Sequence, residues 1–128
     1  MRPSNDPRHI LVVEDESLLA MLLEDLLTDL GMRVCVTASI EDALRAVEAQ
    51  SPLDLALLDV NIGGRMVFPV AQALDRRGIP FAFATGYGEQ GLPEGFRQRP
   101  VVSKPFSLAE LHRVLDIIGK QQALTGAC

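Results

Sequence analysis

The sequence predicts an α/β fold in which one parallel sheet of five strands is covered by helices on both faces. Five short apolar runs alternate with segments of helical periodicity, and they occupy residues 10–13, 34–36, 53–58, 81–84 and 101–102. The runs are almost continuously apolar, which is typical of strands buried on both faces of a parallel sheet. With 128 residues, 48% of them hydrophobic, the chain has room for one such domain and not for two of ordinary size.

The segments between these runs carry the signals of helix starts and ends. Leucines recur at helical spacing over residues 17–30, and Gly31 is placed to end that helix. Serine or proline marks the start of each later helix, and the last of them opens with a capping box. We therefore expect four helices, over residues 17–30, 39–47, 69–78 and 107–118.

Residues 86–99 interrupt the alternation of strands and helices, because this segment contains four glycines and a proline. Each interior glycine costs a helix about 1 kcal/mol and a proline about 3 kcal/mol relative to alanine. The fourth helix of a regular pattern is therefore expected to be weak or missing. We expect the domain to span residues 8–121, with tails at 1–7 and 122–128.

The composition argues against several classes of function. The net charge is −5 and the longest basic cluster is the pair Arg76-Arg77, so direct binding of nucleic acid is not expected. No apolar run approaches membrane-spanning length and no secretory signal opens the chain, which predicts a cytoplasmic protein. Cys35 and Cys128 have neither a metal-ligand spacing nor a disulfide framework, so we interpret both as free thiols.

Polar side chains follow four of the five predicted strands at the point where each strand ends. Glu14 and Asp15 follow the first, Asp59 ends the third, Thr85 ends the fourth and Lys104 follows the fifth. The carboxyl ends of parallel strands share one edge of the sheet, where α/β proteins bind their ligands. The sequence therefore predicts one cluster of three carboxylates, a hydroxyl and an ammonium group.

Three neighbouring carboxylates repel one another, and a divalent cation relieves that repulsion. Mg²⁺ prefers octahedral oxygen coordination and keeps several of its waters in protein sites. We expect Asp15 and Asp59 to bind Mg²⁺ directly and Glu14 to act through a water molecule. The backbone carbonyl of Asn61, two residues beyond Asp59, is placed as a further ligand.

A carboxylate beside Mg²⁺ can attack phosphorus and form an acyl phosphate. Phosphoryl transfer requires positioning of the reactants and stabilisation of charge on the phosphoryl oxygens. Lys104 and Thr85 are placed to contact those oxygens, while Gly63 and Gly64 keep the loop beside Asp59 small enough for a phosphodonor to approach. Asp59 is the predicted phosphoacceptor.

From about residue 8 to residue 120, the sequence resembles the response regulator receiver domain of two-component signalling. The matching positions are the pair Glu14-Asp15, Asp59, Thr85 and Lys104 followed by Pro105-Phe106. The resemblance implies a flavodoxin-like (βα)5 fold with strand order 2-1-3-4-5 and a cis Lys104–Pro105 bond. It also implies a bacterial protein that takes its phosphoryl group from a histidine kinase or a histidine phosphotransfer protein and acts on a downstream protein.

A narrower resemblance concerns Phe83-Ala-Thr-Gly-Tyr87, which is similar to the motif of the FAT GUY receivers. These are single-domain receivers found chiefly in alphaproteobacteria. Residues 59–64 and 77–81 are similar to that subgroup too. The resemblance implies a phosphorylation switch or relay component without an attached output domain.

The chain departs from the broad receiver pattern at its output side. Val101 stands where many receivers carry a tyrosine or phenylalanine that rotates inward upon phosphorylation. Our hypothesis is that phosphorylation instead acts through Thr85 and Tyr87 on residues 86–99, which move from disorder toward order.

Two other classes of function stay open. A phosphatase of the haloacid dehalogenase type would need a second acid two residues after its nucleophile, where this chain has Asn61. A pseudo-receiver would keep the fold as a protein-binding module without being phosphorylated, and retention of all the site residues argues against it. We therefore expect a receiver that is not an enzyme. Its partner recognition is expected on the loops beside Asp59 and on the first helix, at Leu18, Met21, Leu22 and Asp25.

Overall fold

The computed structural model describes residues 8–49, 52–85, 92, 94–96, 99–103 and 107–125. A parallel sheet of five strands forms the centre of the molecule, in the order β2-β1-β3-β6-β7. This arrangement confirms the predicted flavodoxin-like fold and its strand order. The strands are β1 (His9–Val13), β2 (Arg33–Thr37), β3 (Leu55–Asp59), β6 (Phe81–Thr85) and β7 (Val101–Ser103).

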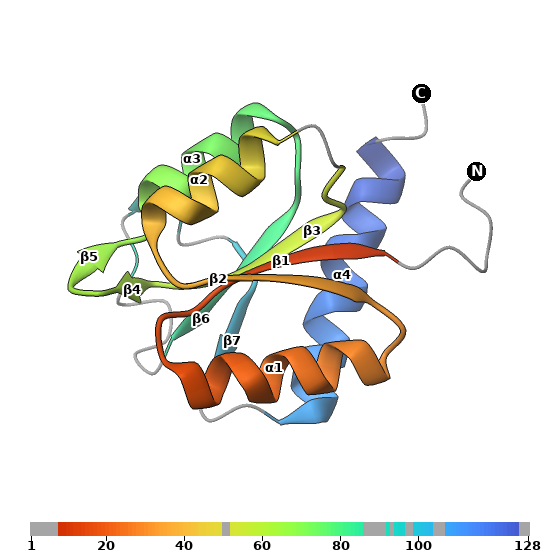
Figure 1. The fold of residues 1–128 in the computed structure, drawn as a ribbon. Helices are drawn as coiled ribbons and strands as arrows, with labels where there is room; N and C mark the ends of the chain where they lie inside the picture. The colour runs from red at the N-terminus through yellow and green to blue at the C-terminus, as the bar shows by residue number, and fades with distance from the viewer. Residues whose placement is uncertain are drawn as a thin grey trace.

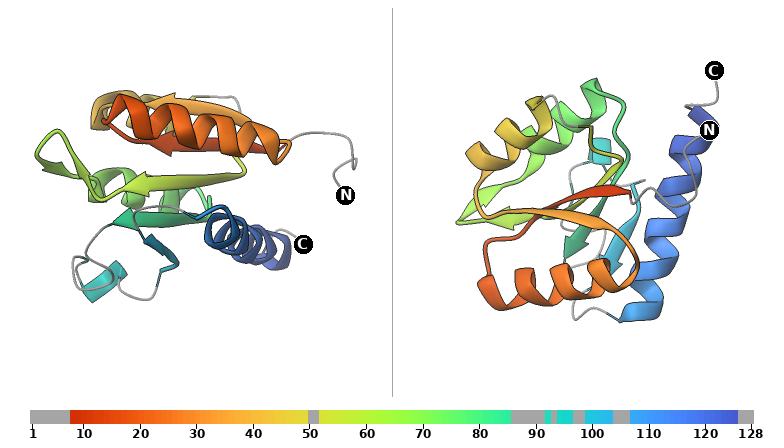
Figure 2. Two further views of the ribbon diagram at one scale, coloured as in Figure 1. Left: turned by 90° about the horizontal axis from the view of Figure 1, so that it is seen from below. Right: turned by 45° about the vertical axis from the view of Figure 1, so that its right-hand side comes forward.

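Two helices cover each face of the sheet (Figures 1 and 2). On one face lie α2 (Ile40–Glu48) and α3 (Phe68–Arg76), and on the other lie α1 (Ser17–Asp29) and α4 (Leu108–Thr125). The last helix thus continues past residue 121, where the domain was expected to end. Among the described residues, no helix combines the length and apolarity that crossing a bilayer requires.

The core explains why the strands are apolar at successive positions. Leu11 and Val13 of β1 pack with residues of α2 and α3, while Ile10 and Val12 pack with residues of α1 and α4. Successive side chains of a strand point to opposite faces of the sheet, so a strand covered on both sides buries every side chain. The sheet is therefore held rigidly between its two helical layers, and its strand ends are fixed in space.

The predicted helix ends are formed as the sequence indicates. The hydroxyl of Ser39 accepts a backbone hydrogen bond of 3.1 Å in the first turn of α2, and Ser107 does the same for α4 at 3.1 Å. Pro69 lies in the first turn of α3. Gly31 and Gly78 follow α1 and α3 with left-handed backbone conformations, φ +87° and +69°.

The described residues between β6 and β7 contain one short helix, the three-residue 3₁₀ helix η2 (Glu94–Phe96). This agrees with the prediction of a weak fourth helix. Leu92 is 2% exposed, and the ring of Phe96 stacks on Phe68 with centroids 5.4 Å apart. Arg99 donates two hydrogen bonds of 2.9 Å to Asp75. These contacts attach the part of the segment nearest β7 to α3.

A second, two-stranded sheet lies between β3 and α3, and the sequence did not predict it. It is an antiparallel hairpin of β4 (Asn61–Ile62) and β5 (Arg65–Met66). Gly63 and Gly64 form its turn with φ of +60° and +84°. Two successive positive φ values are the requirement of a tight hairpin turn, and glycine meets it without strain. The sequence predicted a small, accessible loop at Gly63 and Gly64. The structure shows that these two glycines form the turn of a hairpin.

Candidate metal and phosphoacceptor site

The register of the sheet brings the predicted acids to one level. Val13 pairs with Leu58, so Glu14 follows β1 at the level where Asp59 ends β3. Asp59 in turn pairs with Ala84, which places Thr85 one residue further along the neighbouring strand. Three adjacent strands therefore end in polar residues at the same edge of the sheet.

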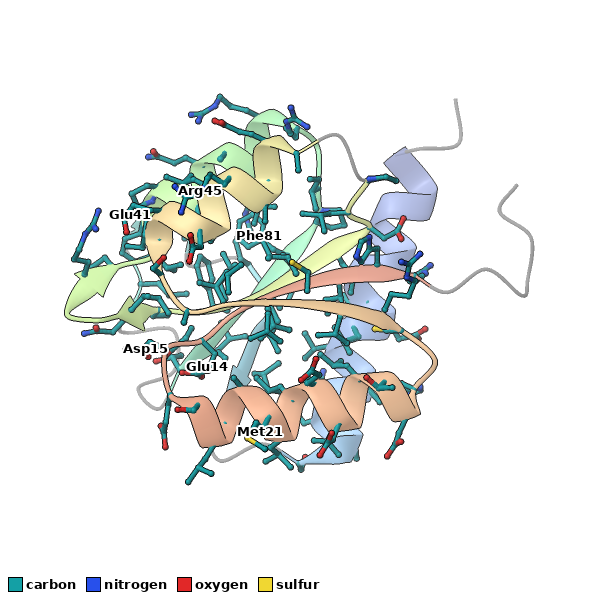
Figure 3. All side chains as sticks on the ribbon, viewed as in Figure 1. Glu14, Asp15, Met21, Glu41, Arg45 and Phe81 are labelled. Atoms are coloured by element: carbon teal, nitrogen blue, oxygen red, sulfur yellow. The ribbon has the colours of Figure 1, made fainter. Side chains whose placement is uncertain are left out.

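The three carboxylates meet at that edge. Glu14, Asp15 and Asp59 each offer an oxygen, and these oxygens all lie within 4.8 Å of one another. Glu14 is buried at 2% exposure, Asp59 is partly buried and Asp15 is exposed. Figure 3 shows Glu14 and Asp15 together beyond the end of β1, beside the first turn of α1. The cluster is thus open to solvent on the side of Asp15.

Glu14 is held by backbone groups on both sides. Its N–H donates to the carbonyl of Thr37 in β2 at 3.0 Å, and its carboxylate accepts the N–H of Glu16 at 3.1 Å. Glu16 is the N-cap residue of α1, so the Glu14 carboxylate lies at the positive end of the helix dipole. This position compensates part of the cost of burying a charged group.

Asp15 is fixed by the hairpin. Its Oδ2 accepts a hydrogen bond of 2.8 Å from the backbone N–H of Gly63. Asn61, the first residue of β4, uses its side-chain Oδ1 to accept the N–H of Gly64 at 2.9 Å. The role of the Asn61 backbone carbonyl as a metal ligand stays a prediction.

Thr85 and Val101 lie on the side of the site away from β1. Thr85 ends β6 with 4% exposure and pairs with Ser103 of β7. Val101 pairs with Phe83 and packs against the core on the side of α2 and α3, so no aromatic ring stands at this position of β7. Three predicted residues, Lys104, Pro105 and Tyr87, lie outside the described residues.

The donor set fits a hard divalent cation. All the candidate ligands are oxygens, from three carboxylates and the backbone carbonyl of Asn61, which Mg²⁺ and Ca²⁺ prefer and softer metals do not. Ligand oxygens of one Mg²⁺ lie roughly 3 to 4 Å apart, given metal–oxygen distances of about 2.1 Å. Oxygens already within 4.8 Å need only small side-chain rotations to reach that spacing. The arrangement can therefore hold one cation and present Asp59 beside it.

Sequence reasoning missed the backbone groups of the hairpin that contact the site. The fragment Asn61-Ile-Gly-Gly-Arg-Met66 does contain a signal, because two glycines between short flanking pairs are typical of a tight hairpin. Strands of two residues are too short to show the alternation of apolar and polar side chains by which a strand is predicted. The contact of Arg65 with Glu41 gives no signal in the sequence at all, since the two residues lie far apart along the chain.

Comparison with known proteins identifies relatives over most of the chain. Residues 10–116 match the family of the response regulator receiver domain. The TorCAD operon transcriptional regulatory protein TorR of Escherichia coli O157:H7 is 34% identical over 111 residues, which cover 82% of this chain and 47% of TorR. The chain thus spans about half the length of the curated relatives it matches.

Two solved structures are informative about the site and the fold. The solution structure of SdrG from Sphingomonas melonis Fr1 is 42% identical, with a TM-score of 0.79, and the match covers 91% of this chain and 98% of SdrG. The receiver domain of the sensor histidine kinase PA1611 from Pseudomonas aeruginosa PAO1 is 25% identical, with a TM-score of 0.75 and coverage of 90% and 99%. The latter structure has a magnesium ion coordinated in its active site cleft.

The charge arrangement predicts how Asp59→Asn changes stability. Without metal, the variant has one negative charge fewer among three, so its free energy of unfolding in EDTA should rise by about 1 kcal/mol, the size of the repulsion between two charges 4 Å apart in water. Added Mg²⁺ should stabilise the native chain more than the variant, because it binds the folded state more tightly when all three acids are present.

Urea unfolding in EDTA and in MgCl₂ measures both effects. Glu24→Gln, which removes an exposed charge from the middle of α1, serves as the control and should show neither. An Asp59→Asn variant that is less stable in EDTA, or equally stabilised by Mg²⁺, would contradict the site.

Proposed function

The chain belongs to the family of response regulator receiver domains, and on that premise we propose that it is a phosphorylation switch with Asp59 as its phosphoacceptor. The observation that supports this best is the meeting of the Glu14, Asp15 and Asp59 oxygens within 4.8 Å at the carboxyl ends of parallel strands. An aspartate at such a place lies beside a cation site and can be reached by a phosphodonor from solvent. Phosphoryl transfer requires both.

The proposed donor is a phosphohistidine of a histidine kinase or a histidine phosphotransfer protein. A carboxylate oxygen of Asp59 attacks phosphorus, the new P–O bond forms as the P–N bond to imidazole breaks, and the departing imidazole takes up a proton. Asp15, Asp59 and the carbonyl of Asn61 would hold Mg²⁺ directly, with Glu14 acting through water. The ion supplies positive charge beside the phosphoryl oxygens.

Thr85 and Lys104 would contact the remaining phosphoryl oxygens. The end of β6 supports this role for Thr85, since it lies one residue beyond the partner of Asp59 in the sheet. Lys104 directly follows the last residue of β7 in the sequence. Together with a bound cation, the Lys104 ammonium group would balance the charge that accompanies phosphorylation of a carboxylate, and the Thr85 hydroxyl would donate a hydrogen bond to it.

The domain would act as a switch, a relay component or a phosphate sink. A pseudo-receiver that binds a protein without being phosphorylated is the alternative. Retention of Glu14, Asp15, Asp59, Thr85 and Lys104 favours the phosphorylated form.

Phosphorylation by a small-molecule phosphodonor tests the proposal. With phosphoramidate and Mg²⁺, the native chain should gain the mass of one phosphoryl group, because Asp59 lies beside the cation site. Intact-mass spectrometry should detect no gain for Asp59→Ala or without Mg²⁺, and a full gain for the control Asp29→Ala. A native chain that stays unmodified would favour the pseudo-receiver.

The surface of α1 beside the site is proposed to bind the phosphodonor protein. Leu18, Met21 and Leu22 are 76%, 60% and 45% exposed, and with exposed Asp25 they follow the spacing of one helical stripe. Exposed apolar side chains that lie together on a helix are typical of protein-binding surfaces. The stripe begins three residues after Asp15, so a partner docked there would lie beside the proposed phosphoacceptor site.

Met21→Lys separates docking from chemistry. Placing a charge in the apolar stripe should lower kcat/KM for transfer from a phosphorylated histidine protein by about tenfold, the effect of losing one central interface contact. The rate with phosphoramidate should stay unchanged. Gln72→Lys adds the same charge to an exposed position of α3, on the opposite face of the sheet, and should affect neither rate. If Met21→Lys lowered the rate equally with the histidine protein and with phosphoramidate, the defect would lie in the phosphoacceptor site and not in docking.

Phosphorylation is further proposed to act on the segment that follows Thr85. Val101 provides no ring that could rotate, and Leu92, Phe96 and Arg99 are already packed against the rest of the domain. The change is therefore expected in residues 86–91, which lie outside the described residues.

Backbone NMR with and without beryllofluoride, a mimic of the phosphoryl group, tests this switch. Order parameters of residues 86–91 should rise from below about 0.6 toward about 0.85, while those of Phe96 and Arg99 stay constant. Asp59→Ala should show no response to the mimic. Equal order in both states would rule out an ordering mechanism.

A further inference from the structure

The hairpin of β4 and β5 carries a contact to the site that phosphoryl chemistry alone does not explain. We propose that this hairpin positions Asp15 for metal binding, and that the ion pair of Arg65 with Glu41 holds the hairpin in place. The inference rests on the proposed function, because Mg²⁺ is the ligand for which Asp15 is positioned.

The first step concerns the freedom of Asp15. Its side chain is exposed and lies in the connection between β1 and α1, so packing does not fix its rotamer. The hydrogen bond of 2.8 Å from the Gly63 N–H to Oδ2 does, and a bond to an ionised carboxylate is stronger than one between neutral groups. The remaining oxygen, Oδ1, can then face the cation without a search among rotamers.

The second step concerns the rigidity of the donor. The Gly63 N–H belongs to a turn with two positive φ values, in a hairpin whose Ile62 is only 3% exposed and joins the core. Val67 closes the base of the hairpin by donating its N–H to the carbonyl of Val60 at 2.9 Å. The base of the hairpin is therefore anchored to the core. The turn consists of two glycines, which have no side chains that could anchor it directly.

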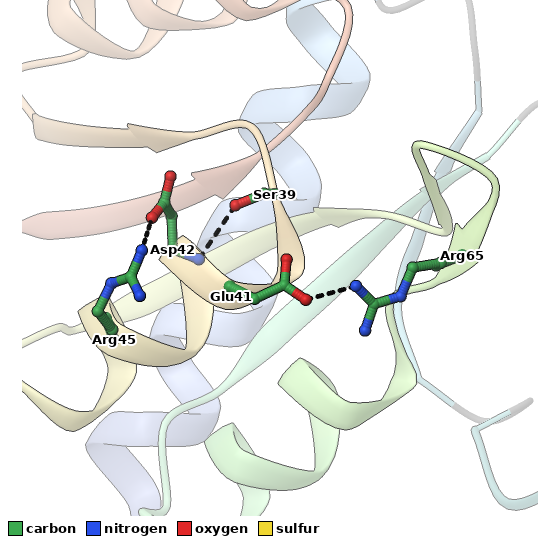
Figure 4. A network of polar contacts seen from close by, with 5 residues as sticks. All are labelled: Ser39, Glu41, Asp42, Arg45 and Arg65. Carbon is green, nitrogen blue, oxygen red and sulfur yellow. Dashed lines mark hydrogen bonds and ion pairs between the residues drawn. The ribbon is translucent and has the colours of Figure 1, made fainter.

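The third step concerns the far strand of the hairpin. Arg65 extends from β5 to the first turn of α2, where its guanidinium forms an ion pair with Glu41 (Figure 4). Glu41 lies at the positive end of the α2 dipole, so its carboxylate is favoured there in any case. Arg65 thus connects the turn that contacts Asp15 to a helix of the rigid frame.

The state of Glu41 agrees with a pair that persists at neutral pH. The hydrogen bond from Arg65 is the main cause that lowers the pKa of Glu41, and the charges of Arg65 and Arg45 act in the same direction. Because the pKa of Glu41 is lowered, the ion pair contributes to the stability of the fold at pH values above the usual titration range of a glutamate. It is lost only as the pH falls through the lowered value.

Arg65→Gln gives the sharpest test, because two explanations of the role of Arg65 predict opposite changes in Mg²⁺ affinity. If Arg65 acted only through its charge, removing a positive charge near an acidic site would strengthen Mg²⁺ binding. If Arg65 positions the hairpin, its loss should raise the Mg²⁺ dissociation constant roughly two- to fivefold, which corresponds to the loss of an exposed ion pair. Isothermal titration calorimetry with MgCl₂ measures the constant.

Arg45→Gln is the matched control. Arg45 is also an exposed arginine paired with an acid of α2, in this case Asp42, but it does not reach the hairpin. Its replacement should leave the dissociation constant unchanged or slightly lower. The free energy of unfolding in urea should fall slightly and to a similar extent in both variants, because each loses one exposed ion pair, so that a difference in affinity between them does not reflect global instability.

A second pair of variants addresses the turn itself. Gly63→Asn retains a residue that tolerates positive φ and should bind Mg²⁺ within about twofold of the native chain. Gly63→Val places a β-branched residue at φ +60° and should raise the dissociation constant roughly tenfold. A Cβ at this position meets no atom within 4 Å, so backbone conformation rather than a clash causes the difference.

Hydrogen exchange of the Gly63 amide provides a readout without metal. The amide should be protected in the native chain in EDTA and should exchange faster in Asp15→Ala and in Arg65→Gln. A native chain that binds no Mg²⁺ while Gly63 is protected would reject the proposed function and the metal-binding part of this inference, and would retain only the hold of the hairpin on Asp15. Native Mg²⁺ binding that Arg65→Gln leaves equal or makes tighter would overturn the role of the ion pair and with it this inference.

Discussion

The repulsion among Glu14, Asp15 and Asp59 is the constraint on which the site depends. Their oxygens are kept within 4.8 Å because β3, which ends in Asp59, and β1, which Glu14 follows, are fixed between two helical layers, and because the Gly63 N–H holds Asp15. Each apolar contact of β1 and β3 therefore also maintains an electrostatic strain at the strand ends. A bound cation would relieve that strain, so the same packing that folds the domain would also favour metal binding.

The sequence was sufficient for the parts of the molecule that local patterns determine. Continuous apolar runs indicated buried parallel strands, and the acids directly after two of them indicated the cluster. The serine and glycine signals located the helix ends, because a cap involves residues only three or four positions apart. Fold class and the placement of Glu14, Asp15 and Asp59 followed from these patterns, whereas the strand order followed from the resemblance to receiver domains.

The features that the sequence did not reveal depend on contacts between distant positions. The pairs Arg65 with Glu41 and Arg99 with Asp75 each join residues 24 positions apart. The stacking of Phe96 on Phe68 likewise joins a segment after β6 to the start of α3. No periodicity encodes such contacts, because they depend on how complete elements pack against one another. The short hairpin was hidden for a different reason, since strands of two residues show no alternation.

These distant contacts divide the surroundings of Asp59 into two sides of different character. On the side of β1, the Gly63 bond to Asp15, the buried Ile62 and the Arg65 pair attach the hairpin to the frame at several points. On the side of β7, Phe96 and Arg99 attach the described residues that precede β7 to α3. Because the hairpin is attached at several points, a displacement of Asp59 on its side would have to break these contacts. The switch proposed for this chain therefore uses Thr85 and the residues that follow it, and no aromatic ring at position 101.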